Sequence, residues 1–566
     1  MSPSVVVLGI HDGHNAGVAL LKDGKIVAAI QEERLNNIKN WSGPPVASIK
    51  KVFQIAAIHP SELTAIAISG LLRTHAPIVE RPLHVRAYEK FAFLFKGHRG
   101  ARWLVSYLHK FRKFDLIERA LSDLGIRHSE ISFIEHHVSH ASSAFHTRPW
   151  EGDALILTLD GAGDGLCSSV AISDGSEMLR IASSTAYNSP ANVLYSEITG
   201  YLGMKRWEHE YKIMGLAPYG KEEHCLDKIR SIVRVNPSNL LEFENTSGRY
   251  LNQIQGKLRK MLAEQRFDDI AAATQRHFED IVCQWVKAAI DGTGRRKIVF
   301  AGGAFLNVKA NKLIREMPVV DDCYFYPAAS DEGTAVGAAF EAYRLHCVRE
   351  GLAFKRDPMP RLYHGELFEA ESVRAALKAK GLQHAAEIVT DPEGSVADLL
   401  AAGKIVARFS GRGEWGPRAL GNRSILADPS DLRVVKRINS AIKQRDFWMP
   451  FAPSILDSRM DDYLVNARFA PYMVEAFETK ASANELIAAL HPQDLSARPQ
   501  IVNDWNPSFR RILSSFEKTS GIGGLLNTSF NLHGYPIVGT PERAIETFLN
   551  SKLDNLAMGE FLVARS

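Results

Sequence analysis

Two histidines four residues apart are the most informative chemical feature of the sequence. His136 and His140 fall on one face of a predicted helix in HHVSHASSAF, where two imidazole rings can bind one cation. Asp160 follows a predicted strand in LDGAGDG, and Asp331 precedes a predicted helix in ASDEG, so each offers a carboxylate at a strand end. Together they would form a mixed nitrogen and oxygen site that suits Fe²⁺, Mn²⁺, Zn²⁺ or Mg²⁺. We expect this site to bridge nucleotide phosphates, although a histidine pair alone is at least as often a core or capping pair.

A glycine pair and two lysines are candidates for phosphate binding. Gly302 and Gly303 stand in AGGAF, where a strand turns into a helix and backbone N–H groups can approach a phosphate. Lys39 in EERLNNIK and Lys212 in EHEYKIMGLAPYG could pair with phosphate oxygens. The alternatives are a plain tight turn and two surface lysines. Such a phosphate site therefore depends on the fold to bring its residues together.

The second concentration of charge lies in RFSGRGEWGPRALGNRS and the segments after it. Arginine forks bind phosphate and carboxylate oxygens through two hydrogen bonds at once, and the neighbouring glycines let the backbone approach the same anion. Trp415 and Leu420 favour a packed loop over the alternative of an exposed basic loop. The later LNTSFN follows a predicted strand and could hold a small planar group such as a carbamoyl. The candidates are Arg408, Arg412, Arg418, Arg423, Lys443, Arg445, Arg498, Asn527, Ser529 and Asn531.

These residues require an α/β fold to position them. The N-terminal SVVVLGIHDG, AGVALLKDG and KIVAAIQEER predict three strands, with Asp23 and Gly24 in a hairpin turn. A helix is predicted over 44–57 and a buried strand in LTAIAISG. Further apolar runs alternate with helical patterns, which places ligand loops at the carboxyl ends of strands. A strand meander followed by βα units resembles the superfamily of actin, the sugar kinases and the heat-shock ATPases.

A domain boundary is predicted near residue 355, where LAFKRDPMPRLYHG carries two prolines and alternating charge. We therefore expect one domain at 1–355 and a second at 356–566. The second contains a helix in SVADLLAAG that stops at Gly403, followed by a strand in KIVARFSG, and is expected to be a separate α/β domain. No internal repeat is visible in the sequence.

Composition narrows the class of protein. The 566 residues are 45% hydrophobic and 23% charged, as is typical of a globular protein, and a formal net charge of +4 does not indicate a nucleic-acid partner. Five widely spaced cysteines argue against a disulfide framework or a zinc knuckle. The start does not have the pattern of a secretory leader, and no apolar run reaches the ~20 residues of a membrane span. We therefore expect a cytoplasmic protein.

The segment between Arg81 and Lys113 is both basic and aromatic. Its simplest interpretation is a solvated helix face with the rings turned inward. The alternative is a docking surface for an anionic or lipid-linked acceptor, because charge attraction and ring burial together favour such ligands.

A series of motifs in one order covers nearly the whole chain: HDGHNAGVALL, QEER, HHVSHASSAF, LDGAGDG, YKIMGLAPYG, AGGAFLN, ASDEGTAVGAA, GRGEWGPRALGNRS, PFAPS, RPQ and LNTSFN. Together they resemble the O-carbamoyltransferases of the nodulation, cephamycin and tobramycin type. The resemblance implies an N-terminal actin/sugar-kinase-like domain, similar to the tRNA threonylcarbamoyltransferase, and a C-terminal YrdC-like α/β domain. It also implies that carbamoyl phosphate loses its phosphate and that the carbamate attacks the α-phosphate of ATP. The resulting carbamoyl-adenylate would then carbamoylate an acceptor hydroxyl.

Carried onto this sequence residue by residue, the resemblance assigns roles to the candidates. The metal, iron in the family, would be bound by His136, His140, Asp160 and Asp331. His14 would be the base that deprotonates the acceptor hydroxyl, and the other catalytic residues would be Lys39, Arg418 and Lys443. Substrate and cofactor contacts are assigned to His11, Asp12, Lys212, Gly302, Gly303, Asn307, Arg412, Arg445, Arg498, Asn527, Ser529 and Asn531.

The leading hypothesis is ATP-dependent transfer of a carbamoyl group from carbamoyl phosphate to a hydroxyl of a sugar, glycan or secondary metabolite. Two alternatives stay open: threonylcarbamoyl transfer to tRNA, against which the near-neutral charge weighs, and a nucleotide-binding switch without catalysis. We expect no nucleic-acid partner, and leave a homodimer and contact with a lipid-linked acceptor open. Met449 departs from the W-R-P-F-A-P pattern of some relatives, so Arg445 could replace a lost phosphate contact.

Overall fold

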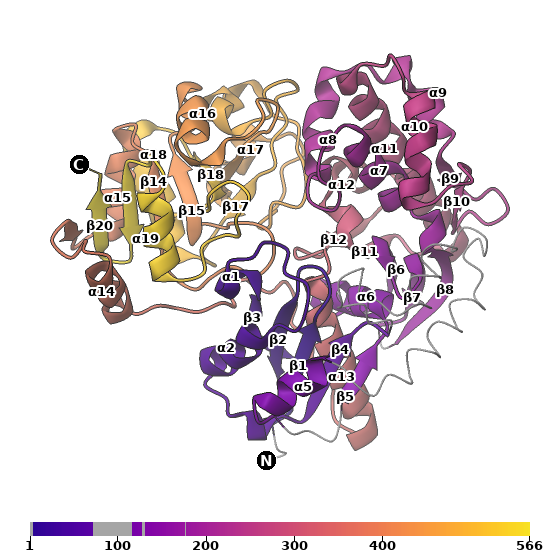
Figure 1. The fold of residues 1–566 in the computed structure, drawn as a ribbon, viewed down its shortest axis with the longest axis horizontal. Coiled ribbons are helices and arrows are strands. Elements are labelled where there is room, and N and C mark those ends of the chain that lie inside the picture. The colour runs from indigo at the N-terminus through magenta and orange to yellow at the C-terminus, as the bar shows by residue number, and fades with distance from the viewer. Residues whose placement is uncertain (1–3, 72–115, 127–130, 176, 566) are drawn as a thin grey trace. The chain divides into compact units, whose positions relative to one another are not determined.

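The chain forms two compact units (Figure 1). The computed structural model describes residues 4–71, 116–126, 131–175 and 177–565. Unit 1 comprises Met1–Ala29 and Trp41–Pro360, and unit 2 comprises Ile30–Asn40 and Arg361–Ser566. Unit 2 therefore includes a short N-terminal segment that no pattern in the sequence indicated. The basic aromatic segment between Arg81 and Lys113 lies outside the described residues.

The first sheet of unit 1 is built on the N-terminal strand meander. Its order is β3-β2-β1-β4-β5, with β1 antiparallel to β2 and parallel to β4. Asp23 and Gly24 have φ of +51° and +81°, as a tight hairpin turn requires, so the predicted hairpin is confirmed. The predicted helix over 44–57 is α2 (Val46–Ala56). The strands are β1 (Val6–His11), β2 (Gly17–Lys22), β3 (Lys25–Gln31), β4 (Ala65–Ser69) and β5 (Ile131–Ile134).

The second sheet of unit 1 repeats the strand order of the first. Its order is β12-β11-β6-β7-β8, so the first strand in sequence again lies in the middle, next to the second and the fourth. As in the first sheet, the central strand pairs antiparallel with the next strand, β7, and parallel with the fourth, β11. The strands are β6 (Ala154–Gly163), β7 (Leu166–Ser173), β8 (Met178–Thr185), β11 (Lys297–Ala301) and β12 (Asp322–Phe325).

Two helices of unit 1 pack closely behind these sheets. Helix α13 (Gly333–Glu350) contacts α6 (His136–Thr147) as well as β1 and β4. A Cβ atom at Gly337 would lie 1.7 Å from the carbonyl oxygen of Ser139, so only glycine permits this approach. The remaining helices and the small sheet are α5 (Leu116–Asp123), α7 (Glu197–Tyr201), α8 (Glu210–Leu216), α9 (Leu226–Arg230), α10 (Gln255–Met261), α11 (Phe267–Thr293), α12 (Val308–Arg315), β9 (Val233–Val235) and β10 (Phe243–Asn245).

Unit 2 contains an eight-stranded sheet in the order β13-β20-β19-β14-β15-β18-β16-β17. Its strands are β13 (Ala386–Ile388), β14 (Val406–Phe409), β15 (Arg423–Ala427), β16 (Ala452–Leu456), β17 (Gln500–Val502), β18 (Gly524–Ser529), β19 (Asn555–Met558) and β20 (Phe561–Ala564). Its helices are α1 (Glu33–Asn36), α14 (Ala370–Ala379), α15 (Pro392–Ala401), α16 (Arg433–Ile438), α17 (Met460–Tyr463), α18 (Pro507–Ser520) and α19 (Pro541–Leu549).

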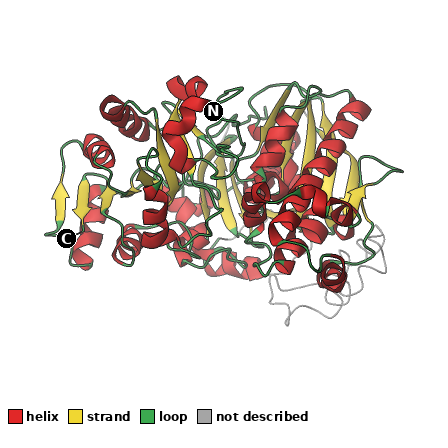
Figure 2. Cartoon of the chain, turned by 90° about the horizontal axis from the view of Figure 1, so that it is seen from above, coloured by secondary structure: helices red, strands yellow, loops and turns green. Residues whose placement is uncertain are grey.

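Helices cover both faces of this sheet, as the alternation of its buried residues shows. Val406 of β14 packs in a core with Phe509 of α18, whereas the next residue, Ala407, packs in a core with Phe548 of α19. Figure 2 shows helices flanking the strands. Gly403 has φ +72° after α15, so the predicted helix stop is confirmed. The α/β class predicted from the sequence is therefore confirmed for both units.

Candidate functional site

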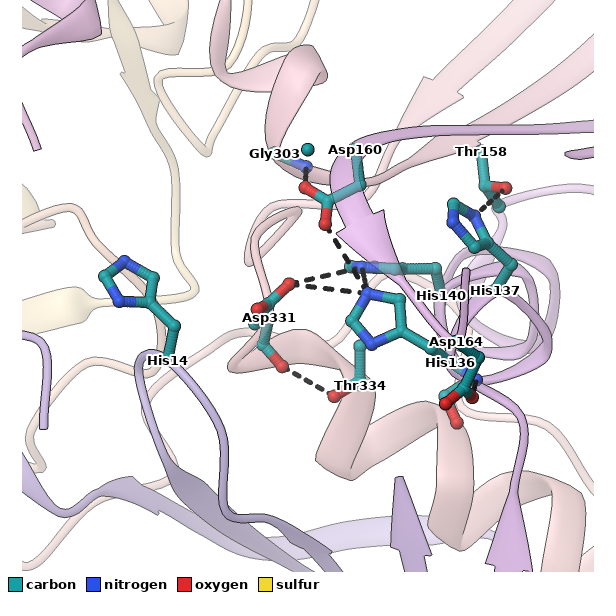
Figure 3. Close-up of polar contacts among 12 residues, drawn as sticks. His14, His136, His137, His140, Thr158, Asp160, Asp164, Gly303, Asp331 and Thr334 are labelled. Atoms are coloured by element: carbon teal, nitrogen blue, oxygen red, sulfur yellow. Dashed lines mark hydrogen bonds and ion pairs between the residues drawn. The ribbon is translucent and has the colours of Figure 1, made fainter. Parts of the chain in front are cut away.

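The two histidines and two aspartates predicted as metal ligands lie together in unit 1 (Figure 3). Each offers one ligand atom, and these four atoms lie within 4.8 Å of one another. The Nε2 atoms of His136 and His140 are 3.1 Å apart. Asp331 Oδ1 lies 3.6 Å from both of them, and Asp160 Oδ2 lies 3.5 Å from His136 Nε2. Side chains that are up to 195 positions apart in the sequence thus face one point.

Local structure explains how these side chains are placed. Helix α6 begins at His136, and Glu135 caps it by accepting the Val138 N–H at 2.8 Å. The helical spacing of four residues then puts both imidazole rings on one face. Asp160 lies on β6, where its Oδ1 accepts the Gly303 N–H at 2.9 Å. Asp331 precedes α13, where its carbonyl oxygen accepts the Thr334 hydroxyl.

The electrostatics of the group fit a divalent cation. Burial lowers the pKa of His136, but the hydrogen bond to Asp160 and the charge of Asp331 outweigh it and raise this pKa to about 9. Burial raises the pKa of Asp160, but the neighbouring histidines lower it by more. The pKa of Asp160 therefore lies below its usual value. Among the described residues, no donor lies within hydrogen-bond distance of the buried Oδ1 of Asp331, although this atom faces both imidazoles at 3.6 Å. A cation between two imidazole nitrogens and two carboxylates would satisfy all four groups.

The predicted N-terminal histidines lie at different distances from this group. His11 is buried, with Nε2 3.9 Å from Asp331 Oδ2 and 3.0 Å from the His14 carbonyl oxygen. Burial lowers the pKa of His11 to about 4, against the opposing effect of Asp331. His14 is half-buried, and in Figure 3 its ring lies apart from the four candidate ligands. Asp12 is buried directly after β1.

Other candidates of unit 1 make structural contacts. The Gly303 N–H, predicted to approach a phosphate, donates to Asp160 instead. Gly302, with φ +106°, donates its N–H to the Ala329 carbonyl. Asn307 caps α12 through the Ala310 N–H and exchanges hydrogen bonds with Gln275. Lys212 is half-buried on α8.

The sequence reasoning missed Asp164 and His137. Asp164 accepts the backbone N–H of His136 at 2.7 Å and therefore helps to fix the start of α6. It is the last aspartate of LDGAGDG, so the motif contained the signal. His137 is buried and hydrogen-bonds Thr158 Oγ1 at 2.8 Å, which leaves it outside the ligand group.

Unit 2 holds a group of five basic residues. Burial lowers the pKa of Lys443 well below its usual value of 10.5, and the charges of Arg445 and Lys39 lower it further. Burial likewise lowers the pKa of Arg498, with added effects from Arg418 and Arg445. The causes of both shifts are burial and other cations. We call Lys39, Arg418, Lys443, Arg445 and Arg498 the cation cluster.

Polar groups predicted near this cluster also lie there. Lys443 Nζ donates to Asn531 Oδ1 at 2.6 Å and to Ser529 Oγ at 3.1 Å. Arg445 donates to Thr528 Oγ1 at 3.2 Å. Asn527, on the same strand β18, donates to Ser454 Oγ, and its buried Oδ1 has no hydrogen-bond partner in the part of the chain that the structure describes. The end of β18 thus presents polar groups beside the cations.

The other arginines of the glycine-rich loop hold backbone. Arg412 donates to the His364 and Gly365 carbonyls, and Arg408 donates to the Gly421 carbonyl and to Asn422 Oδ1. Arg423 donates to the Ser410 carbonyl and stacks on a neighbouring ring. The packed loop predicted from Trp415 is confirmed, because that ring is buried.

A carboxylate that the sequence reasoning missed organises this loop. Glu414 Oε1 accepts the backbone N–H groups of Leu420, Asn422 and Arg423 at 2.8–3.1 Å. Glu414 is itself buried. The single acid among the arginines of GRGEWGPRALGNRS was the available signal for a loop-holding residue.

Two family models cover most of the chain. The N-terminal model of the carbamoyltransferases matches residues 6–340, and the C-terminal model matches residues 397–565. The chain belongs to the carbamoyltransferase family. This carbamoyltransferase is therefore a transferase, and the expected enzyme class is confirmed.

Relatives of this carbamoyltransferase include nodulation proteins. It is 32% identical to the nodulation protein NolNO of Sinorhizobium fredii over 98% of this chain and 79% of the relative. It is 32% identical to NolO of Bradyrhizobium diazoefficiens over 76% of this chain and 79% of the relative. Among solved structures, HypF of T. kodakarensis matches at 14% identity with a TM-score of 0.35 over 63% of this chain and 49% of that one, which is too low to assign a fold.

Within the described ranges, no helix of this carbamoyltransferase is both long enough and apolar enough to cross a bilayer. The cytoplasmic location stays a prediction.

Proposed function

We propose that this carbamoyltransferase transfers a carbamoyl group from carbamoyl phosphate to a hydroxyl of a sugar, glycan or secondary metabolite, and that it consumes ATP through a carbamoyl-adenylate. The observation that carries the proposal is the cation cluster of unit 2. Cations that repel one another while partly buried raise the free energy of the empty site, and a polyanion relieves this repulsion. ATP, with its triphosphate, is a polyanion of the right chemistry.

The adenylate step is assigned to unit 2. A carbamate oxygen attacks the α-phosphorus of ATP, the bond to the bridging oxygen breaks, and pyrophosphate leaves with the electron pair. Lys443 and Arg418 neutralise the charge that develops on the phosphate oxygens, as Lys39 does at the outer phosphates. Arg445 and Arg498 each bind phosphate oxygens of the nucleotide through bidentate hydrogen bonds. Ser529 and Asn527 hold the planar carbamoyl group by hydroxyl and amide hydrogen bonds.

The metal and transfer steps are assigned to unit 1. His136, His140, Asp160 and Asp331 would hold a divalent cation, with Fe²⁺ proposed from the family resemblance. Such a cation supplies Lewis-acid stabilisation of phosphate oxygens. His14 removes the proton from the acceptor hydroxyl, whose oxygen then attacks the carbamoyl carbon and displaces AMP. We propose that water hydrolyses carbamoyl phosphate to carbamate and inorganic phosphate at 1–355, and that this carbamate enters the adenylate step at 356–566, to which residues 30–40 contribute.

The proposed fold families follow the same division. The strand order that both sheets of unit 1 share supports an actin/sugar-kinase-like domain. We assign unit 2 to the YrdC-like fold on the resemblance of its motifs.

Pyrophosphate exchange tests the proposal. The metal-loaded protein is incubated with ATP, labelled pyrophosphate and carbamoyl phosphate but no acceptor, and label should enter ATP only when carbamoyl phosphate is present. Exchange that instead requires threonine and bicarbonate would indicate threonylcarbamoyl-adenylate formation. A folded, metal-loaded sample without any exchange contradicts the adenylate mechanism.

A further inference from the structure

The N-terminal segment of unit 2 supplies Lys39 to the cation cluster and also contacts the arginine loop. It comprises residues 30–40, which leave β3, form the short helix α1 and end just after Lys39. Lys39 is half-buried, and its charge contributes to the lowered pKa of Lys443. A segment this short, with four helical residues, has little structure of its own and needs tertiary contacts to stay in place.

Arg34 makes the contact that joins this segment to the arginine loop. Its guanidinium is buried, and Nη2 donates to the Gly416 carbonyl at 2.8 Å and to Gln31 Oε1 at 2.9 Å. Gly416 has φ +95°, which glycine adopts readily and other residues do not. Arg418 stands two positions after Gly416, so Arg34 fixes the backbone from which this cation projects.

Glu33 extends the same chain of contacts to Lys39. Its Oε1 lies 3.4 Å from Arg34 Nη1, and its Oε2 accepts the backbone N–H of Asn40 at 2.8 Å. Asn40 follows Lys39 directly and has φ +55°. Contacts therefore run from the Gly416 carbonyl through Arg34 and Glu33 to the residue next to Lys39.

We propose that Arg34 is a positioning residue that sets the anion site of unit 2, because it holds the Lys39 segment and the Arg418 loop in one arrangement. The proposal rests on the proposed function, in which Lys39 and Arg418 contact the phosphates of ATP. Repulsion within the cation cluster favours moving its members apart while no anion is bound. The buried contacts of Arg34, which we call the tether, oppose this movement. Less conformational entropy is therefore lost when an anion binds.

Three substitutions test the proposal from different sides. Arg34→Ala removes the tether. Glu33→Gln removes the charge that pairs with Arg34 and weakens the hydrogen bond from the Asn40 N–H. Gly539→Ala leaves the tether's side chains intact but places a Cβ atom 2.0 Å from the Arg34 carbonyl oxygen, so the segment must shift. Lys380→Ala is the control, since it removes an ion pair with Glu546 between α14 and α19.

The readout is binding of inorganic tripolyphosphate by calorimetry, with thermal unfolding of each variant measured in parallel. Arg34→Ala and Gly539→Ala should weaken binding about tenfold, the loss expected for one charged contact, while Lys380→Ala binds as the parent chain does. In a Lys39→Ala/Arg418→Ala background, Arg34→Ala should change the affinity no further, because the cations that it positions are gone. Glu33→Gln gives a second measurement should Arg34→Ala fail to fold.

Three results would overturn the inference. These are unchanged binding by both Arg34→Ala and Gly539→Ala, an equal loss in the background without Lys39 and Arg418, and no tripolyphosphate binding by the parent chain. Absence of pyrophosphate exchange alongside Lys39-dependent tripolyphosphate binding would contradict the adenylate mechanism alone and leave the positioning role intact.

Discussion

Lys443 Nζ lies 2.6 Å from Asn531 Oδ1, inside unit 2, where its ammonium is screened from water. Its pKa is well below the usual 10.5, first because of burial and then because of the charges of Arg445 and Lys39. A bound polyphosphate adds negative charge and must raise this pKa again.

ATP binding should therefore take up a proton at Lys443. Since only the protonated amine attracts the phosphates, affinity should fall as the pH rises through the lowered pKa of Lys443, at a pH well below the usual 10.5. Calorimetry of ATP binding in two buffers with different heats of protonation measures the uptake. Lys443→Met should bind ATP more weakly and with less proton uptake. Equal uptake in the parent chain and the variant would assign the proton to another group.

A change of one candidate ligand should strongly weaken metal binding by unit 1. His140→Ala deletes one of the four ligand atoms and Asp331→Asn replaces a charged carboxylate by a neutral amide, and we expect metal affinity to fall by about a hundredfold in each. Metal content after loading with Fe²⁺ or Mn²⁺ and gel filtration measures the effect. The exposed His384 gives the matched control, His384→Ala. Full occupancy in both ligand variants would exclude this group as the site.

His14→Ala should separate the two half-reactions. If His14 acts only as the base for the acceptor, pyrophosphate exchange stays within about twofold of the parent rate while carbamoyl transfer falls 10²–10⁴-fold. Mass detection of a carbamoyl gain on a panel of saccharide acceptors measures the transfer. Loss of pyrophosphate exchange together with carbamoyl transfer would instead assign His14 to the formation of the carbamoyl-adenylate.

Glu414→Ala should destabilise unit 2. Three backbone N–H groups would lose their acceptor, and each buried donor left without one costs at least about 1 kcal/mol, so we expect at least about 3 kcal/mol in the free energy of unfolding. Urea unfolding followed by tryptophan fluorescence measures this change. Glu414→Gln keeps one oxygen acceptor and should recover part of the loss, and the exposed Glu371→Ala should have no effect. A stable Glu414→Ala variant would mean that the loop finds other acceptors.

Helical spacing and strand ends were sufficient to predict the ligand group of unit 1. His136 and His140 share a helix face by spacing alone. Asp160 lies towards the end of β6 and Asp331 just before α13, positions that an α/β fold brings to one edge of a sheet. The interpretation of Gly303 as a phosphate contact rested on the same logic, but the sequence could not show that Asp160 would accept its N–H. Which acceptor takes the Gly303 N–H depends on distances in the folded chain, which the sequence does not give.

The N-terminal segment of unit 2 could not be predicted in the same way. Residues 30–40 continue a strand of unit 1, and no change in composition marks the transition. One of the contacts that join them to unit 2 is the hydrogen bond from Arg34 to the Gly416 carbonyl, across 382 positions of the sequence. The repeated strand order of unit 1 was equally hidden, because strand order depends on backbone pairing and does not require similar side chains.

The membership of residues 30–40 in unit 2 has a consequence for biosynthesis. These residues leave the ribosome early, yet their partners in the arginine loop are synthesised only after all of unit 1, so the tether cannot close while translation of the first unit proceeds. The closure is a long-range event that follows much local folding. A recombinant fragment that starts at Arg361 would lack a lysine of its anion site, and adding residues 30–40 as a synthetic peptide should restore polyphosphate affinity.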